Sequence, residues 1–194
     1  MIEIGQSAAV LLASGFSSRF GQSNKLLAPL RGKPLVAHAA ELVGSLPFRE
    51  RVAVVAPRES SLRTLLAGYG FRTIENPEPG DGQESSLRLG LQRALLDGPT
   101  GIVVLLGDMP NLSSAHIEAL AAAAGVATAS VSIADGARMP PVLLPAAMAR
   151  QVLAGTRPLR DSLGNATEVP ASGWMLRDYD TAADFDGDRL EGGP

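Results

Sequence analysis

The sequence contains no cysteine among its 194 residues. Disulfide bonds, thiolate metal sites and a cysteine nucleophile are therefore excluded. Aromatic residues make up only 4% of the chain, too few for the stacking platforms that bind single-stranded nucleic acid. The formal net charge of −3 argues against general nucleic-acid affinity, so any anionic ligand must be held by local cations.

Long apolar runs are missing as well. No segment approaches the ~18 consecutive apolar residues that a membrane-spanning helix requires. The chain begins Met1-Ile2-Glu3, which is acidic where a secretory signal peptide would be basic. We therefore expect a cytoplasmic protein that has neither a membrane nor a nucleic acid as its partner.

Strand-like and helix-like segments alternate along the chain. Apolar runs predict strands over residues 9–12, 52–56, 71–74, 101–106, 129–133 and 141–144. Spacing and capping predict helices over residues 34–45, 60–69, 84–96, 113–124, 146–154 and 158–164. This order indicates an α/β fold, a Rossmann-like three-layer sandwich with a mainly parallel central sheet. We expect a single domain over residues 1–186 and a disordered tail over residues 187–194.

A polar loop follows the first predicted strand, in the segment AAVLLASGFSSRFGQSNK over residues 8–25. Gly15 and Gly21 allow the backbone to turn tightly and to bring its N–H groups close to a ligand. Arg19 and Lys25 can supply fixed positive charge beside it. Together these features predict a site for a polyphosphate.

The spacing of this loop excludes two familiar phosphate loops. No Gly-Lys-Ser/Thr follows Gly15, and no GxGxxG opens a helix directly. The loop instead resembles the nucleotidyltransferase signature, roughly L-A-x-G-x-S-x-R-x-G-x-x-K. Its positions are filled here by Leu12, Ala13, Gly15, Ser17, Arg19, Gly21 and Lys25. With the continuation LLAPLRGKPLVAHAA over residues 26–40, the chain most resembles the molybdenum cofactor cytidylyltransferases.

Asp108 follows the apolar run of residues 102–106, so its carboxylate should emerge at the carboxyl edge of the sheet. A hard oxygen ligand there suits Mg²⁺, which is bound by one or two carboxylates together with phosphate oxygens. A strand-end aspartate is also typical of a helix cap or a turn. The sequence GDMP resembles the family's metal motif, and Gly107 resembles the cytidylyl type more than the guanylyl type.

A second candidate metal ligand lies in RDYDTAADF, residues 177–185. Thr181 and Asp184 have the spacing of a capping box, which places the preceding aspartates just before a helix. The helix dipole alone would favour aspartates there. The segment also resembles the D-x-D-T-P-x-D element that closes family members, with Ala182 in place of proline. This resemblance implies that Asp180 supports the metal, with Asp178 behind it.

The segment PEPGDGQESSLRLGL, residues 77–91, resembles the family's glycine-rich turn that leads into S-S-L-x-x-G. The resemblance implies that the backbone at Gly80 and Gly82 contacts the base edge, and that Ser85 and Ser86 offer hydroxyl groups to the base or the ribose. An ordinary capped helix start explains the same serines. Glu84 departs from the small residue that is common at its position.

The expected acceptor half of the chain fits the family less well. In ADGARMPPVLLP, residues 134–145, Pro140 and Pro141 keep the proline character of the family's G-x-P element. Farther on, GTRPLR stands where cytidylyl-type relatives have G-D-x-G-A-R, so the acid is lost. Arg157 and Arg160 remain, and they could bind an acceptor phosphate or a dithiolene-pterin anion. They could equally be surface charges.

The resemblance implies transfer of CMP from CTP to the phosphate of the molybdenum-molybdopterin cofactor, with Mg²⁺ as cofactor and pyrophosphate as the second product. Its catalytic residues would be Lys25, Arg19 and Asp108, and its metal ligands Asp108 and Asp180. The nucleotide would be bound by Leu12, Ala13, Ser14, Gly15, Ser17, Arg19, Lys25, Gly82, Ser86 and Gly107.

Other functions remain open. The phosphate acceptor could differ, as in guanylyl transfer to molybdopterin or nucleotidyl transfer to a sugar phosphate or methylerythritol phosphate. The protein could also be a non-catalytic carrier that delivers the molybdenum cofactor to an apo-molybdoenzyme. A nicotinamide oxidoreductase is a more distant alternative.

Overall fold

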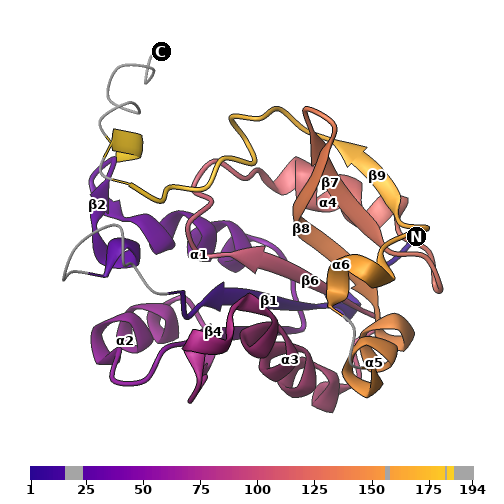
Figure 1. Ribbon diagram of the computed structural model, residues 1–194, viewed down its shortest axis with the longest axis horizontal. Helices are drawn as coiled ribbons and strands as arrows, with labels where there is room; N and C mark the ends of the chain where they lie inside the picture. The colour runs from indigo at the N-terminus through magenta and orange to yellow at the C-terminus, as the bar shows by residue number, and fades with distance from the viewer. Residues whose placement is uncertain (16–23, 156–157, 182, 186–194) are drawn as a thin grey trace.

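The computed structural model describes residues 1–15, 24–155, 158–181 and 183–185. A seven-stranded sheet, ordered β5-β4-β1-β6-β8-β7-β9, forms its centre (Figure 1). The strands are β1 (Ala8–Ala13), β4 (Glu50–Val55), β5 (Arg72–Glu75), β6 (Gly101–Leu106), β7 (Ser130–Ala134), β8 (Ala137–Pro145) and β9 (Thr167–Pro170). Four of the strand pairs are parallel, and β8 alone runs antiparallel to its neighbours β6 and β7. The predicted α/β fold with a mainly parallel sheet is confirmed.

Helices cover both faces of the sheet (Figure 1). One apolar cluster joins the sheet to α1 (Leu35–Ser45), α2 (Ser60–Gly68) and α4 (Ser114–Ala123). The other joins it to α3 (Gln83–Ala94), α5 (Ala146–Ala154) and α6 (Leu159–Ser162). Strand β1 is buried along its whole length because Leu11 faces the first cluster and Val10 the second.

Short elements complete the fold. Strands β2 (Pro29–Leu30) and β3 (Lys33–Pro34) form a separate hairpin. The 3₁₀ turns are η1 (Ile4–Gln6), η2 (Lys25–Leu27), η3 (Pro79–Asp81) and η4 (Leu95–Asp97). The sequence did not predict the hairpin or β9, since each strand is too short to show a pattern. The expected tail over residues 187–194 lies outside the described part of the chain.

The order of the strands reverses around β1. The chain passes from β1 outward to β4 and β5, and then returns to place β6 on the other side of β1. Ligands of such sheets bind at this switch point, beyond the carboxyl ends of the strands. The fold therefore directs attention to the residues that follow Ala13 and Leu106.

Helix α3 packs unusually close to β1, and Gly90 is the reason. A Cβ atom at this position would lie 2.4 Å from Val10 Cγ1 and 3.2 Å from Val54 Cγ2. The missing side chain lets the helix settle onto the sheet and carries its first turn, with Ser86, to the end of β1. No helix in the described ranges is both long and apolar enough to cross a membrane.

Candidate active site

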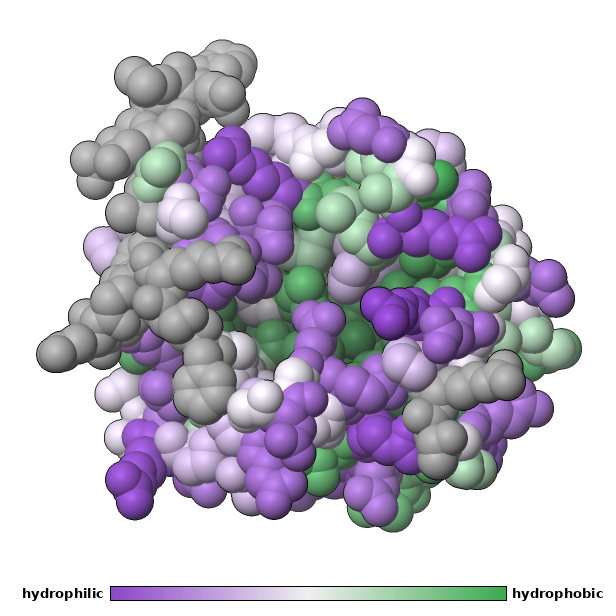
Figure 2. Space-filling model, in the orientation of Figure 1, coloured by the Kyte–Doolittle hydropathy of each residue, from purple (hydrophilic) through white to green (hydrophobic). Residues whose placement is uncertain are grey.

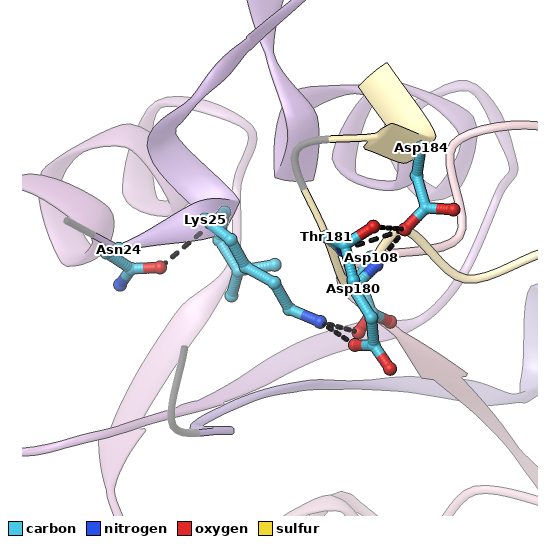
Figure 3. Close-up of polar contacts among 7 residues, drawn as sticks. Asn24, Lys25, Asp108, Asp180, Thr181 and Asp184 are labelled. Carbon is cyan, nitrogen blue, oxygen red and sulfur yellow. Dashed lines mark hydrogen bonds and ion pairs between the residues drawn. The ribbon is translucent and has the colours of Figure 1, made fainter. Parts of the chain in front are cut away.

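Lys25 lies between two carboxylates at the carboxyl edge of the sheet (Figure 3). Its Nζ is 2.8 Å from Asp108 Oδ2 and 2.5 Å from Asp180 Oδ1. Turn η2 presents Lys25, and the Asn24 side chain caps this turn by accepting from the Leu26 N–H at 2.9 Å. Burial alone would lower the pKa of Lys25, but the two carboxylates raise it above its ordinary value. Lys25 is therefore charged.

Asp180 comes from the segment that follows β9 and returns across the end of β6. The Tyr179 N–H donates to the Asp108 carbonyl oxygen at 3.0 Å, which joins this segment to the end of the strand. Asn111 donates to the Trp174 carbonyl at 3.0 Å and accepts at 2.6 Å from Arg31, whose guanidinium stacks on the Trp174 ring. These contacts fix the segment against the body of the protein and so position Asp180.

Asp184 holds the local conformation around Asp180 (Figure 3). Its Oδ2 accepts from the N–H groups of Asp180 and Thr181, at 3.0 and 2.7 Å, and from the Thr181 hydroxyl. Its Oδ1 accepts from Arg177 at 3.0 Å. Burial would raise the pKa of Asp184, but these hydrogen bonds lower it to about 2. The predicted pairing of Thr181 with Asp184 is confirmed.

The described part of the site carries more negative than positive charge. Lys25 faces Asp108 and Asp180, and the Asp178 side chain lies near both acids. Desolvation, followed by the charge of Asp108, raises the pKa of the Asp178 carboxyl. A triphosphate that entered here would meet these carboxylates, so it would need additional cations to bind.

The donor set around Asp108 fits a Mg²⁺ ion. Asp108 Oδ1 is buried and has no hydrogen-bond partner, whereas Oδ2 is held by Lys25. An unpartnered, buried carboxylate oxygen is a suitable ligand for a hard cation. Within the described ranges, no three His, Asp or Glu side chains form a metal-binding group. The protein would thus supply one or two carboxylates, and phosphate oxygens or water would supply the remaining ligands.

A cavity of about 380 Å³ opens beside these residues. Nine of the predicted site residues line it, namely Leu12, Ala13, Ser14, Gly15, Lys25, Gly82, Ser86, Asp108 and Asp180. Gly80 lines it as well, together with Leu26, Pro79, Gln83 and Leu106, which the sequence did not single out. Strand ends, the glycine-rich turn and the C-terminal segment thus meet at one place. Ser17, Arg19 and Gly21 lie outside the described residues.

A hydrogen-bond network connects three elements around this cavity. The Ser14 and Ser86 hydroxyl oxygens are 2.5 Å apart, which joins the end of β1 to the first turn of α3. Asn76 Nδ2 donates to Ser86 Oγ and to Ser85 Oγ, both at 2.8 Å. Asn76 is buried directly after β5, and sequence reasoning missed it. The feature of the sequence that could have identified Asn76 is a polar residue directly after a predicted strand.

Gly107 occupies a different place from the one expected of a nucleotide contact. It is buried and does not belong to the residues that line the cavity. Its N–H donates to the Leu12 carbonyl at 2.9 Å. An added Cβ atom would lie 3.3 Å from Val36 Cγ2 and 3.4 Å from Leu26 Cδ2. Gly107 is therefore closely packed, and a side chain there would need small shifts of Val36 and Leu26.

A second cavity, of about 500 Å³, adjoins the first and shares Leu12, Gly82, Gln83 and Leu106 with it. Figure 2 shows a hollow in the middle of this face, with apolar residues at its floor and hydrophilic residues around it. The apolar lining consists of Leu12, Leu87, Val104, Leu106, Val131, Met139, Pro140, Val142, Pro158, Leu159 and Leu163. Asp81, Gln83, Glu84, Arg138 and Arg160 are the polar lining residues.

The predicted acceptor residues fall around this second cavity in different ways. Arg160 lines it with a side chain that is 85% exposed. Pro140 lines it, whereas Pro141 is buried and its carbonyl accepts from the Ser132 hydroxyl at 2.8 Å. Arg157 lies outside the described residues.

Three curated proteins illustrate the sequence relationships. The chain is 34% identical to the purine catabolism protein PucB of Bacillus subtilis over 142 residues, which cover 69% of this chain and 67% of PucB. It is 32% identical to the "Probable molybdenum cofactor guanylyltransferase" of Pyrococcus horikoshii over 113 residues, which cover 57% of this chain and 52% of that protein. It is 31% identical to the CMP-5'-(3-aminopropyl)phosphonate synthase of Streptomyces rubellomurinus, over 88% of this chain but only 24% of that protein.

Solved structures share the fold at lower identity. The crystal structure of Rv0371c from Mycobacterium tuberculosis superposes with a TM-score of 0.80, at 22% identity, covering 96% of this chain and 98% of that chain. The inositol-1-phosphate CTP transferase of T. maritima superposes with a TM-score of 0.78, at 13% identity, covering 98% and 96%. Residues 9–168 match the MobA-like NTP transferase domain. The chain therefore belongs to the MobA-like family of nucleotidyltransferases.

Proposed function

We propose that this nucleotidyltransferase moves CMP from CTP to the phosphate of the molybdenum-molybdopterin cofactor in a Mg²⁺-dependent reaction. One observation carries the proposal: Lys25, Asp108 and Asp180 meet in a cavity that adjoins a second, apolar cavity. The first suits the triphosphate and its metal. The second suits an acceptor with a flat ring whose faces can pack against apolar side chains, as the pterin ring system has.

The reaction requires no protein nucleophile. An oxygen of the acceptor phosphate attacks the α-phosphorus of CTP, the bond from this phosphorus to the bridging oxygen breaks, and pyrophosphate leaves with that oxygen. Such a step depends on alignment and on neutralisation of the charge that moves to the leaving group. Mg²⁺ held by Asp108 and Asp180 would supply part of that neutralisation when bound.

Lys25 has a second role in this account. Its ammonium group is held by two carboxylates in the structure described above. With nucleotide present, Lys25 would donate to triphosphate oxygens, which releases the carboxylates for the metal. Arg19, on the same loop, would add a second cation. Ser14, Gly82 and Ser86, which line the cavity around the end of β1, would contact the base or the ribose.

The choice of base and acceptor rests on the sequence and the relatives. The motif at Gly107 and Asp108 resembles the cytidylyl type, and one relative is by name a CMP-phosphonate synthase. Another relative is named a probable molybdenum cofactor guanylyltransferase. Because that name also specifies guanylyl transfer, GMP transfer from GTP to the same acceptor is the second candidate.

The test is pyrophosphate release with Mg²⁺, measured for CTP, GTP, ATP and UTP with and without molybdenum-molybdopterin. We expect release that requires the cofactor and is fastest with CTP. Asp108→Asn should lose this activity, because the isosteric amide is a poor ligand for Mg²⁺. Asp97→Asn is the matched control, since this exposed carboxylate pairs with Arg93 on a distant surface.

Each other outcome identifies a different function. Release with GTP alone would replace the cytidylyl proposal with the guanylyl one. Release with a sugar phosphate or methylerythritol phosphate, but not with molybdopterin, would replace the acceptor. Cofactor binding without turnover of any nucleotide would identify a carrier for an apo-molybdoenzyme.

A further inference from the structure

Two buried side-chain oxygens have no hydrogen-bond partner in the part of the chain that the structure describes. One is Asp108 Oδ1, which lines the first cavity and fits a metal ion. The other is Glu84 Oε1, and Glu84 lines the second cavity. A buried polar atom without a partner is costly, and native proteins rarely keep one without a use. The unpartnered oxygen of Glu84 therefore needs its own explanation.

Glu84 is held in place by its other oxygen. It lies in the first turn of α3, directly after Gly82 and Gln83, which line both cavities. Its Oε2 accepts from the Leu159 N–H at 3.3 Å, which ties α3 to the start of α6. This contact leaves Oε1 buried beside the second cavity, with its hydrogen-bonding capacity unused.

The other polar residues of the second cavity are placed differently. Arg138 is engaged, because it donates to the Glu168 carboxylate at 2.8 Å and to the Leu163 carbonyl at 2.7 Å. Asp81, Gln83 and Arg160 are exposed to solvent. Water can satisfy exposed groups, whereas a donor on the molecule that fills the cavity would satisfy Glu84 Oε1.

We propose that Glu84 determines acceptor specificity by accepting a hydrogen bond from the exocyclic amino group of the acceptor ring. The inference rests on the proposed function, and it names the part of the acceptor that the protein reads. The aminopyrimidinone edge of a pterin presents a ring N–H beside an exocyclic amino group. An oxygen acceptor in an apolar pocket discriminates strongly between an edge that carries this amino group and one that carries a carbonyl oxygen in its place.

The first experiment measures binding by fluorescence titration with 6-hydroxymethylpterin and 6-hydroxymethyllumazine. The two probes differ at position 2, where the pterin has an amino group and the lumazine a carbonyl oxygen. We expect the wild-type protein to bind the pterin more tightly. Glu84→Gln should weaken pterin binding about 10- to 100-fold, because the amide N–H₂ that takes the place of Oε1 cannot accept a hydrogen bond from the amino group. The same change should leave lumazine binding within about twofold.

A structural role for Glu84 predicts a different result. Glutamine keeps the shape of the side chain and an oxygen that can accept from Leu159 N–H, so Glu84→Gln should melt at or above the wild-type temperature. Glu84→Ala provides a second variant that removes both contacts and should also lose the preference for pterin. Glu118→Gln, on the exposed surface of α4, is the control for the substitution itself.

The outcomes separate this inference from the proposed function. If wild type binds the pterin and Glu84→Gln binds it equally well, the role of Glu84 is refuted while the proposed function stands. If wild type prefers the lumazine, the inferred donor edge is wrong. If wild type releases pyrophosphate only with an acceptor that contains no pterin, the proposed function fails, and this inference fails with it.

Discussion

Replacing Lys25 by methionine tests the central ion-pair arrangement. Methionine keeps most of the length of the side chain but removes the ammonium group that lies between Asp108 and Asp180. The two carboxylates would then face each other, with Asp178 nearby, and no described cation would bridge them. The variant should therefore be less stable than wild type in the absence of metal.

The size of the effect follows from burial. Removing one partner of a buried ion pair costs about 3–5 kcal/mol. The Lys25 and Asp108 side chains are 9% and 18% exposed, but Asp180 is 43% exposed and its pair is screened by water. We therefore take the lower end of the range, which corresponds to a fall in Tm of roughly 6 to 12 °C for a chain of this size.

The assay is thermal unfolding with and without Mg²⁺. Lys25→Met should regain part of its lost Tm when Mg²⁺ is added, because the ion binds the freed carboxylates of the folded state. Wild type should respond less, since Lys25 already holds them. Lys33→Met is the control, because Lys33 pairs with Glu41 at the surface and its loss should cost about 1 kcal/mol or less. Equal Tm values for Lys25→Met and Lys33→Met would refute the reasoning.

Two further predictions concern packing and pH. Gly90→Ala should destabilise the protein by about 1–3 kcal/mol, because the new Cβ atom collides with Val10. The control Gly68→Ala has open space at its Cβ position and should be neutral or stabilising. Urea denaturation measures the free energy of unfolding of both variants, and equal effects would contradict the close approach of α3. Asp184→Asn should cost about 2 kcal/mol at pH 7, because the folded-state pKa of about 2 lies below the ordinary value of 3.8. This stabilisation is fully present above about pH 4 and is lost as the pH falls towards 2. The difference in free energy of unfolding between wild type and variant, measured by urea denaturation, should therefore shrink over that interval. A constant difference would show that the pairing with Arg177 and Thr181 does not depend on charge.

The sequence was sufficient for most of the fold because the sheet is buried on both faces. Strands β1 and β6 are continuous apolar runs, and their carboxyl ends are followed by Ser14 and Asp108. Strand β9 was missed because Val169 is the one β-branched apolar residue in TEVP, whereas the run predicted at β5 contains both Phe71 and Ile74. Half-exposed edge strands carry too little hydrophobic pattern to be recognised from sequence.

The site was predictable only in parts. Resemblance to the family's motifs pointed to Lys25, Asp108 and Asp180. It did not show that one ammonium group bridges both acids, since Asp180 lies 155 residues beyond Lys25. Such a contact depends on how the C-terminal segment folds back. Asn76 was missed because it belongs to no motif and acts through the hydroxyl groups of its neighbours. Gly107 was assigned to the nucleotide on resemblance, and the structure shows it closely packed against Val36 and Leu26.

The most direct test of the account follows the α-phosphate itself. Wild-type protein is incubated with Mg²⁺, molybdenum-molybdopterin and CTP labelled at the α-phosphorus. The products are then separated and identified by mass spectrometry. The account predicts that label enters a cytidine dinucleotide form of the cofactor, with one pyrophosphate released for each label transferred. Label that stays in CTP, or that appears in free CMP while the cofactor is unchanged, would contradict it.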